Sequence, residues 1–595
     1  MNHAKRLYQM TVLYLRTKIN RVQYIMVIAT LTGLFSGLTA VLLKTFVHYL
    51  QQWIKEIHVN RFAYLLFPAI GLFITVFVVR RFLGKQFERG IAMVLRAIAR
   101  RSSFIPLSHT YQHVITSSVT VGLGGSAGLE APIVATGSAI GSNTARISDL
   151  NYRERTLLIA CGAAAGIAAV FNAPIAGVIF AIEVLLTETV VSYFIPLIIS
   201  SVIGALCSKI ILAEGALFNF VLQQHFDYRN VPAYIVLGMM AGLISLYYAR
   251  SFKGMETQLH HWKLNPYAKA ILGGVLLMGI YFVFPPLFGE GYESVKQLAS
   301  GTPEQVNDNT TLFSLMDENV SLIIFAGLIV LLKPIAAAIT IGSGGNGGNF
   351  APSLFAGSYL GFFFSKLLNS TGWFKIPEGN FSLAGMAGVL SGVMYCPLTA
   401  IFLIAEITNG YELFIPLMLV SSISFFIVKS YEPFSMETKK LAMEGQIFTH
   451  KKEKNILTSF SLQEILKDNY ESIGIDKKMK DLIELIKKSE KNIYAVHDVK
   501  GRFAGIIELN DIKEQLFRPE QHEKIMVRSL VKKPAAILQE DQEMHTVMEK
   551  FDITQSWYLP VLDKEKKFIG FISKTKLFNK YREALSSQGD LYEES

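Results

Sequence analysis

The sequence predicts an α-helical polytopic membrane protein built from two internal repeats, followed by a small α/β region. Of its 595 residues, 51% are hydrophobic and only 17% are charged. Charge is sparse from about residue 21 to about 435 and dense after that. A Gly-rich segment also occurs twice in the apolar part. These features predict a membrane domain over residues 1–445 and a region outside the membrane over 446–595.

The apolar part contains several stretches that are long enough, or nearly long enough, to cross lipid. They cover 24–50, 62–79, 194–213, 231–248, 322–341 and 413–428. Between them lie shorter apolar pieces that Gly and Pro interrupt. Irregular backbone at membrane depth is tolerated only where protein or a water-filled cavity surrounds it. These pieces therefore indicate broken helices that line a site.

The N-terminus is basic, with Lys5, Arg6, Arg16, Lys18 and Arg21 ahead of or at the start of the first long stretch. An excess of Lys and Arg marks the cytoplasmic side, so we expect this end to be cytoplasmic. The net charge of +10 mainly reflects that orientation. The basic residues do not gather on an aromatic-bearing soluble module, so nucleic-acid binding is not expected.

The Gly-rich segment reads GSAGLEAP at 125–132 and GNGGNFAP at 345–352, an offset of 220 residues. Each copy continues into a helix rich in small residues. Backbone amides at such helix starts attract anions. Gly-interrupted apolar segments at matching positions of a duplicated membrane chain indicate a transport site between the repeats. We place the repeats at about 25–215 and 230–440.

A second match follows each Gly-rich segment. Ala173-Pro174 precedes Glu183 by nine residues, and Cys396-Pro397 precedes Glu406 by the same distance. We expect both carboxylates to be structural and to hydrogen-bond a neighbouring loop.

Glu130 is the first candidate for a functional side chain. It is a carboxylate in an otherwise uncharged segment, and an ionisable group at membrane depth is a functional hypothesis by default. At a helix start it can occupy the place of an anion, and a proton or a competing anion can displace it, so it could act as a gate. The alternative is a carboxylate that only satisfies the helix dipole. Phe350 holds the matching position of the second repeat and cannot compete for an anion site.

The C-terminal region contains two similar units, at about 462–518 and 525–585. Helices are expected at 479–488 and 544–551, and strands at 493–496, 503–508, 557–561 and 568–573, with final helices at 511–517 and 576–581. A strand with Gly before two apolar residues, then a helix, occurs twice and resembles a tandem CBS pair. In that family an Asp opening the last helix often holds a nucleotide ribose. Asp511 has that place in the first unit, whereas Lys576 has it in the second. The alternatives are adenine-nucleotide binding at Asp511, or a helix-capping Asp in a structural dimerisation module.

The membrane part resembles the CLC family of chloride channels and transporters. GSAGLEAP is similar to the family's gating-glutamate motif, 348–352 to its second anion-binding segment, and 162–174 to its GAAAG…FNAP core. The resemblance implies a CLC-type inverted repeat with broken helices, in a homodimer with one pore per subunit. It makes Glu130 the external gate. It places the anion near the amides of Asn349 and Phe350, with Gly128, Gly348 and Ala351 beside them.

Two departures concern the inner mouth. The family's first motif supplies a serine, but its usual distance from the gate falls on 88–92, where Arg89 takes the serine's place. Arg89 could concentrate anions there, or it could be an ordinary positive-inside residue. The family's pore tyrosine corresponds to Glu437 or Phe434. A carboxylate at Glu437 would disfavour anions unless Arg89 or a proton compensated for it.

A third departure concerns proton coupling. Proton-coupled members carry a glutamate directly after the acid that ends the FNAP helix, and here that pair is Glu183-Val184. Valine cannot carry a proton, which favours passive conduction.

These observations predict selective anion passage, chloride above fluoride or nitrate, through a passive channel gated by Glu130. The alternatives are a proton/chloride antiporter and a nucleotide-sensing membrane signalling protein. No enzyme, metal or cofactor is expected, apart from the adenine nucleotide that Asp511 would hold. We expect a multi-pass protein of a prokaryotic plasma membrane with a cytoplasmic C-terminal region. Its three cysteines lie in apolar segments and have no metal or disulfide spacing.

Overall fold

The computed structural model describes most of the chain and divides it into two compact units, Met1–Ile447 and Phe448–Ser595. The described residues are 19–56, 63–83, 90–100, 103–186, 194–212, 225–300, 318–372, 375–408, 411–443, 462–466, 470–542 and 544–586. Arg89 lies outside them.

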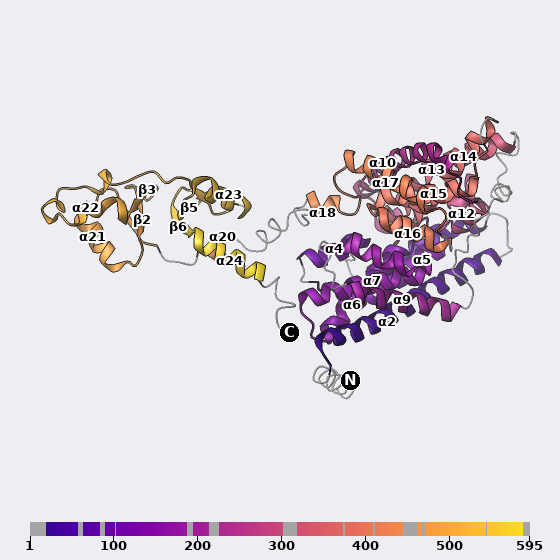
Figure 1. The fold of residues 1–595 in the computed structure, drawn as a ribbon, viewed down its shortest axis with the longest axis horizontal. Helices are drawn as coiled ribbons and strands as arrows, with labels where there is room; N and C mark the ends of the chain where they lie inside the picture. Colours follow the sequence, from indigo (N-terminus) through magenta and orange to yellow (C-terminus); the bar gives the residue numbers. More distant parts are fainter. Residues whose placement is uncertain are drawn as a thin grey trace. The chain divides into compact units, whose positions relative to one another are not determined.

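The first unit is helical, and its two repeats lie against each other (Figure 1). The first repeat contains α2 (Arg21–Glu56), α3 (Phe67–Val78), α4 (Gly90–Arg100), α5 (His109–Gly122), α6 (Glu130–Ile147), α7 (Tyr152–Phe171), α8 (Pro174–Phe180) with a π-helical turn (Ala181–Leu185), and α9 (Phe194–Leu212). The second contains α10 (Val231–His261), α11 (Pro266–Val283), α12 (Tyr292–Ala299), α13 (Glu318–Gly342), α14 (Phe350–Ser370), α15 (Glu378–Met394), α16 (Pro397–Ile407), α17 (Phe414–Tyr431) and α18 (Lys439–Met443).

Among the described residues, eight helices are long and apolar enough to cross a membrane. Each of the six stretches expected from the sequence corresponds to one of these helices, with ends that differ by a few residues. The largest difference is in α10, which runs on to His261. The spans at α7 (Tyr152–Phe171) and α11 (Pro266–Val283) were not expected. Helix α7 is dominated by small residues and lies almost wholly inside the protein. Its apolar character therefore reflects protein packing and not contact with lipid.

The central helices pack at very short range through glycine. A Cβ atom on Gly141 of α6 would overlap the Leu158 carbonyl of α7, and one on Gly361 of α14 would overlap the Phe381 carbonyl of α15. Gly141 and Gly361 are separated by 220 residues, which is the offset between the two repeats. The two glycines therefore hold matching positions. Small residues let membrane helices approach closely, which is how α6 and α14 are held at the centre.

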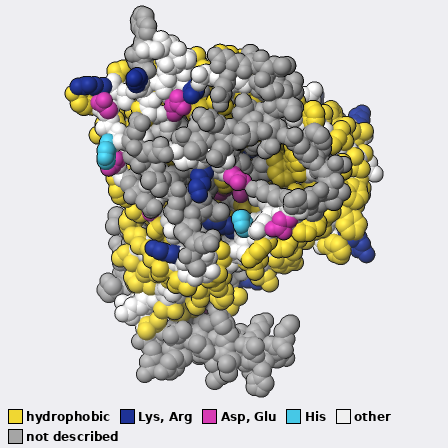
Figure 2. Space-filling model, turned by 90° about the vertical axis from the view of Figure 1, so that its right-hand side faces the viewer, with side chains coloured by type: hydrophobic (Ala, Val, Ile, Leu, Met, Phe, Trp, Pro, Cys, Tyr) yellow, Lys and Arg dark blue, Asp and Glu magenta, His cyan; other side chains and the backbone are white. Residues whose placement is uncertain are grey.

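Large apolar side chains remain exposed on the outer helices. Figure 2 shows broad areas of hydrophobic side chains on one face, with charged side chains scattered among them. Examples are Leu42 on α2, Ile210 on α9, Leu243 on α10 and Phe426 on α17, each more than half exposed. Such surfaces are expected where lipid or another subunit covers the protein.

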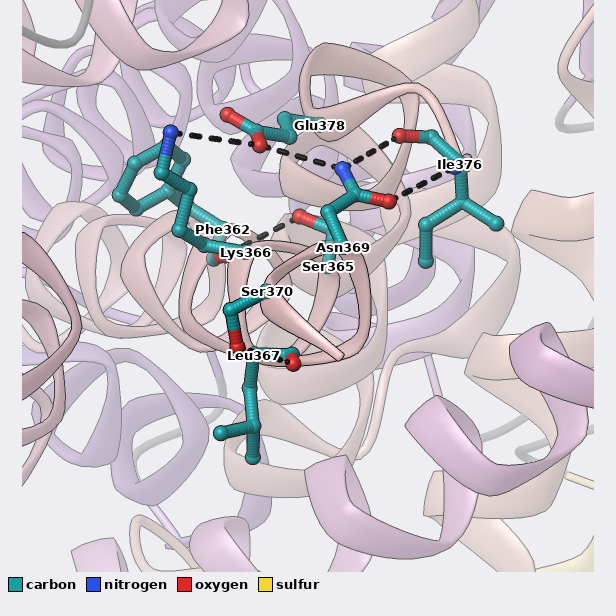
Figure 3. Close-up of polar contacts among 8 residues, drawn as sticks. All are labelled: Phe362, Ser365, Lys366, Leu367, Asn369, Ser370, Ile376 and Glu378. Carbon is teal, nitrogen blue, oxygen red and sulfur yellow. Dashed lines mark hydrogen bonds and ion pairs between the residues drawn. The ribbon is translucent and has the colours of Figure 1, made fainter. Parts of the chain in front are cut away.

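The end of α14 is tied to the start of α15 by a polar clamp (Figure 3). The Asn369 side chain donates to the Ile376 carbonyl (3.0 Å) and to Glu378 (3.1 Å), and accepts from the Ile376 amide (2.9 Å). Lys366 forms an ion pair with Glu378 at 3.6 Å. The clamp orients α14 with respect to its packing partner.

The second unit contains two three-stranded sheets of the same design, ordered β1-β2-β3 and β4-β5-β6. Their strands are β1 (Ser472–Gly474), β2 (Ile493–His497), β3 (Phe503–Glu508), β4 (Leu538–Gln539), β5 (Tyr558–Leu562) and β6 (Phe568–Ser573). In each sheet the first pair is parallel and the second antiparallel. The helices are α20 (Leu462–Ile465), α21 (Met479–Lys488), α22 (Lys513–Leu516), α23 (Met544–Thr554) and α24 (Lys574–Ser586).

The expected α/β repeat of 65 residues is present, with Phe503 of β3 stacked on Phe568 of β6 at 6.0 Å between ring centroids. The expected strand bounds at β3 and β6 agree with the structure. The helix expected at 511–517 is wrong in part, because a 3-10 turn (Leu509–Ile512) precedes the four-residue α22. Asp511 lies inside that turn, and the residue that precedes α22 is Ile512. Asp511 is therefore not the helix-capping residue of α22.

We expect Gly141→Ala to destabilise the membrane unit by about 3 kcal/mol, because its methyl group would overlap backbone that cannot rotate away. The matched control is Gly254→Ala in α10, where a Cβ would meet nothing within 4 Å. That change should stabilise by about 0.5–1 kcal/mol through helix propensity. Thermal unfolding of the detergent-solubilised protein measures both, and equal melting temperatures for the two variants would contradict the packing argument.

Candidate functional site

The two Gly-rich segments meet backbone to backbone. The Gly128 amide donates to the Gly348 carbonyl at 2.9 Å, and the Gly348 amide donates to the Gly128 carbonyl at 2.8 Å. A Cβ on Gly128 would lie 2.8 Å from the Cβ of Ala351, and one on Gly348 would lie 2.5 Å from that of Ala131. Glycine at both positions therefore allows α6 and α14 to begin close together, with their positive ends near one point.

A reciprocal pair of hydrogen bonds supports this junction. The Ser126 amide donates to Thr340 Oγ1 at 3.1 Å, and the Asn346 amide donates to Thr120 Oγ1 at 3.0 Å. Both pairs are related by the 220-residue offset. Each repeat thus supplies a hydroxyl to the loop that precedes the other repeat's broken helix.

Glu130 lies at the start of α6 and reaches across to α14. Its side chain is 1% exposed. Its Oε1 accepts from the Tyr292 hydroxyl at 2.5 Å, and its Oε2 accepts from the Ala351 amide at 3.4 Å. The carboxylate therefore occupies the anion-attracting start of the opposite helix. Phe350, the matching residue, packs on Phe171 and Phe180 instead.

A second polar group surrounds Asn349, directly before α14. The Tyr248 hydroxyl of α10 donates to Asn349 Oδ1 at 3.2 Å. Glu437 forms a hydrogen bond with the same Asn349 side chain and interacts electrostatically with Lys253. A Cβ on Gly90, the first residue of α4, would lie 3.7 Å from Glu437 Oε2. Glu437 therefore lies beside Asn349. The sequence had offered both Glu437 and Phe434 as the residue at the place of the family's pore tyrosine.

Glu183 and Glu406 each accept hydrogen bonds from backbone amides of the other repeat. Glu406 accepts from the amides of Ile175 at 3.0 Å and Ala176 at 2.8 Å, in the first turn of α8. Glu183 makes the same pair of bonds to the first turn of α16, at 3.1 and 2.9 Å. The expected structural role is confirmed, but the partner is a helix start of the other repeat and not a loop. Val184, the next residue, lies partly buried in the π-helical turn.

Sequence reasoning missed Glu290, which interacts with Glu130, and the two lysines that act on Glu290. Lys44 of α2 donates to the Val170 carbonyl at 2.8 Å, and Lys333 of α13 donates to the Gly289 carbonyl at 3.3 Å. Both lysines are buried, and both act electrostatically on Glu290. The signal was present, because each lysine lies inside a long apolar stretch where a charge is costly.

In the C-terminal unit, Asp511 is already paired. Lys532 Nζ lies 2.5 Å from Asp511 Oδ2 and 3.1 Å from Glu508 Oε2. The hydrogen bond to Asp511 raises the pKa of Lys532, so the ammonium stays charged. The Lys532 backbone is bridged to Ile506 of β3, which holds the lysine in place.

A sequence model of a family described as voltage gated chloride channel matches residues 71–429. A curated relative is chloride channel protein CLC-e of Arabidopsis thaliana, 27% identical over 534 residues, covering 82% of this chain and 71% of the relative. Another is the voltage-gated ClC-type chloride channel ClcB of Escherichia coli O9:H4 (strain HS), 32% identical over 317 residues, covering 50% of this chain and 70% of the relative.

Solved structures share the fold. A slow cyanobacterial Cl-/H+ antiporter matches with a TM-score of 0.61 and 21% identity, over 72% of this chain and 99% of that one. A eukaryotic CLC transporter matches with a TM-score of 0.60 and 16% identity, over 93% of this chain and 97% of that one. At these identities the likeness concerns the fold alone.

We expect Glu406→Ala to destabilise the membrane unit by about 2–4 kcal/mol, because it leaves two helix-start amides without an acceptor. Glu406→Gln keeps one acceptor oxygen and should therefore lose less stability than Glu406→Ala. Glu412→Ala is the control, since its side chain is 49% exposed and its pairing with His225 is worth at most about 1 kcal/mol. Thermal unfolding in detergent orders the three, and a Glu406→Ala protein as stable as Glu412→Ala would contradict the capping role.

Proposed function

Because this chain belongs to the voltage gated chloride channel family, we propose that it passes chloride across a membrane between the starts of α6 and α14. The position of the Glu130 carboxylate is the main support: an anionic group, buried and tethered, accepts a hydrogen bond from the opposing helix start. A free anion would find the same amides and the same helix dipoles there.

In this proposal Glu130 is a tethered competitor for the permeant anion. When it is protonated, or when chloride displaces it, the Ala351 amide becomes available beside the amides of Asn349 and Phe350. The amides of Gly128 and Gly348, also expected from the sequence to bind the anion, stay paired with each other's carbonyls. Backbone donors of this kind replace part of the hydration shell of an ion. Gly128 is needed so that the backbones of the two Gly-rich segments can approach each other. Fluoride and nitrate are the alternatives to chloride as the permeant ion.

Passive conduction is our first candidate, since Val184 offers no proton acceptor at the end of the α8 segment. Coupled proton/chloride exchange is the second candidate, and a specific observation favours it. Glu437 supplies a carboxylate at Asn349, beside the same junction that holds Glu130. One titratable group on each flank of the junction would give protons a route that does not need position 184.

We further propose that the C-terminal unit is a CBS pair with a structural role. Asp511 forms an ion pair with Lys532, so a ribose hydroxyl would have to compete with that ammonium group for the carboxylate. This pairing weighs against a nucleotide-sensing signalling protein.

The protein is proposed to act as a homodimer, with one path per subunit. Apolar residues exposed on four adjacent helices of the two repeats support this: Ile175, Ile198, Leu398 and Ile415. The plasma membrane, with the N-terminus and the C-terminal unit in the cytoplasm, is the location that the basic N-terminus favours.

Glu130→Gln should raise chloride flux at neutral external pH by about tenfold, which corresponds to about 1.4 kcal/mol of weaker binding of the neutral amide at the helix starts. It should also remove most of the activation by external acid. Flux from liposomes at several external pH values measures both effects, with Glu293→Gln, an exposed residue of α12, as the control. A Glu130→Gln protein with the wild-type pH profile would rule out the gate.

The reversal potential of the protein in liposomes separates the two candidates. Under a chloride gradient alone, a passive channel should follow chloride, and an added proton gradient should not shift the potential. A shift with protons would establish exchange, and Glu437→Gln should then abolish the shift while chloride flux persists. A shift that survives in Glu437→Gln would place the inner proton acceptor elsewhere.

A further inference from the structure

A short segment with alternating glycines lies over the start of α6. Gly289 and Gly291 both have left-handed backbone, with φ of +63° and +82°. The Gly289 amide donates to the Gly124 carbonyl at 3.2 Å. The two glycines thus flank Glu290 and hold it against the loop that leads into α6.

The Glu290 carboxylate accepts a hydrogen bond at the start of α6, just as the Glu130 carboxylate does at the start of α14. The Leu129 amide donates to Glu290 Oε1 at 3.2 Å. Leu129 is the residue directly before Glu130. Two residues after Glu290, the Tyr292 hydroxyl donates to Glu130. The same segment therefore holds one carboxylate and touches the other.

The charges around Glu290 are balanced. Glu130 of α6, Lys44 of α2 and Lys333 of α13 all act electrostatically on it, and its own charge acts on Tyr292 of α12. Two buried ammonium groups thus accompany two carboxylates. Buried charges are retained only when they are compensated. Neutralising either carboxylate leaves one uncompensated positive charge, which one monovalent anion would restore.

As a whole residue Glu290 is partly exposed, whereas Glu130 is buried. Its neighbour Lys44 lies 23 residues along α2 from Arg21, a rise of about 35 Å. Because the basic N-terminus marks the inner side, Lys44 and Glu290 lie toward the outside. Glu290 is therefore placed where external solution can reach it first.

We propose that Glu290 is a second gating carboxylate, in series with Glu130 on the outer side, and that Lys44 and Lys333 hold the anion that replaces it. The proposal rests on anion passage gated by Glu130. Opening then requires both carboxylates to be protonated or displaced. Each carboxylate that is neutralised or displaced allows one anion to bind near Lys44 and Lys333.

The test is chloride flux from liposomes at varied external pH and constant internal pH. Wild-type activation should involve about two coupled protons, and Glu290→Gln should reduce this to about one. It should also raise flux at neutral pH by about two- to fivefold, the size of one charge at a helix start. Glu130→Gln should keep a shallow pH dependence that disappears in Glu130→Gln/Glu290→Gln. Glu293→Gln is the matched control from the same segment.

A Glu290→Gln profile that coincides with those of wild type and Glu293→Gln overturns the proposal. If Glu290→Gln does not fold, Glu290→Asp keeps the charge with a shorter reach. It should keep the two-proton slope with a displaced midpoint, and an unchanged midpoint overturns the proposal. Failure of the Glu130 gate would be seen separately, as a wild-type profile in Glu130→Gln.

Discussion

The backbone contact between Gly128 and Gly348 is the constraint on which the membrane unit depends. Two helix starts can face each other at the centre of a membrane protein only if their leading loops pair and neither carries a Cβ. The pairing satisfies amides that lipid could not satisfy. The buried small-residue helices behind it follow from the same need, because α6 and α14 must pass close to α7 and α15.

Carboxylates at helix starts recur through this unit, and their geometry separates two uses. Glu183 and Glu406 each accept two backbone amides at 3.1 Å or less, across the repeat boundary. Glu130 accepts the Ala351 amide at 3.4 Å and the Tyr292 hydroxyl at 2.5 Å. A paired cap is costly to remove. At Glu130, by contrast, an anion could replace the carboxylate at the long bond from Ala351, and protonation would remove the charge that strengthens the bond from Tyr292. The same attraction thus locks the scaffold at two positions and supports release at a third.

Local patterns predicted the repeats well. The 65-residue period of the C-terminal region placed β3 and β6 at their observed bounds, because Gly and alternating apolar residues determine a short strand. The apolar stretches predicted α2, α9 and α13 for a similar reason. The helix after β3 is shorter than the local pattern predicted, because a 3-10 turn takes its first residues. Asp511 in that turn pairs with Lys532, twenty-one residues later, a contact that a local pattern does not encode.

The sequence by itself determined the duplication, the membrane character and the identity of Glu130 as the charged residue in a Gly-rich helix start. The tertiary structure alone decided which groups Glu130 meets. Tyr292 and Ala351 are 162 and 221 residues away along the chain. It also brought Lys44, Lys333 and Glu130 together around Glu290. Hydrophobic periodicity encodes how one segment folds against its surroundings, whereas charge compensation at membrane depth depends on which distant segments are packed together.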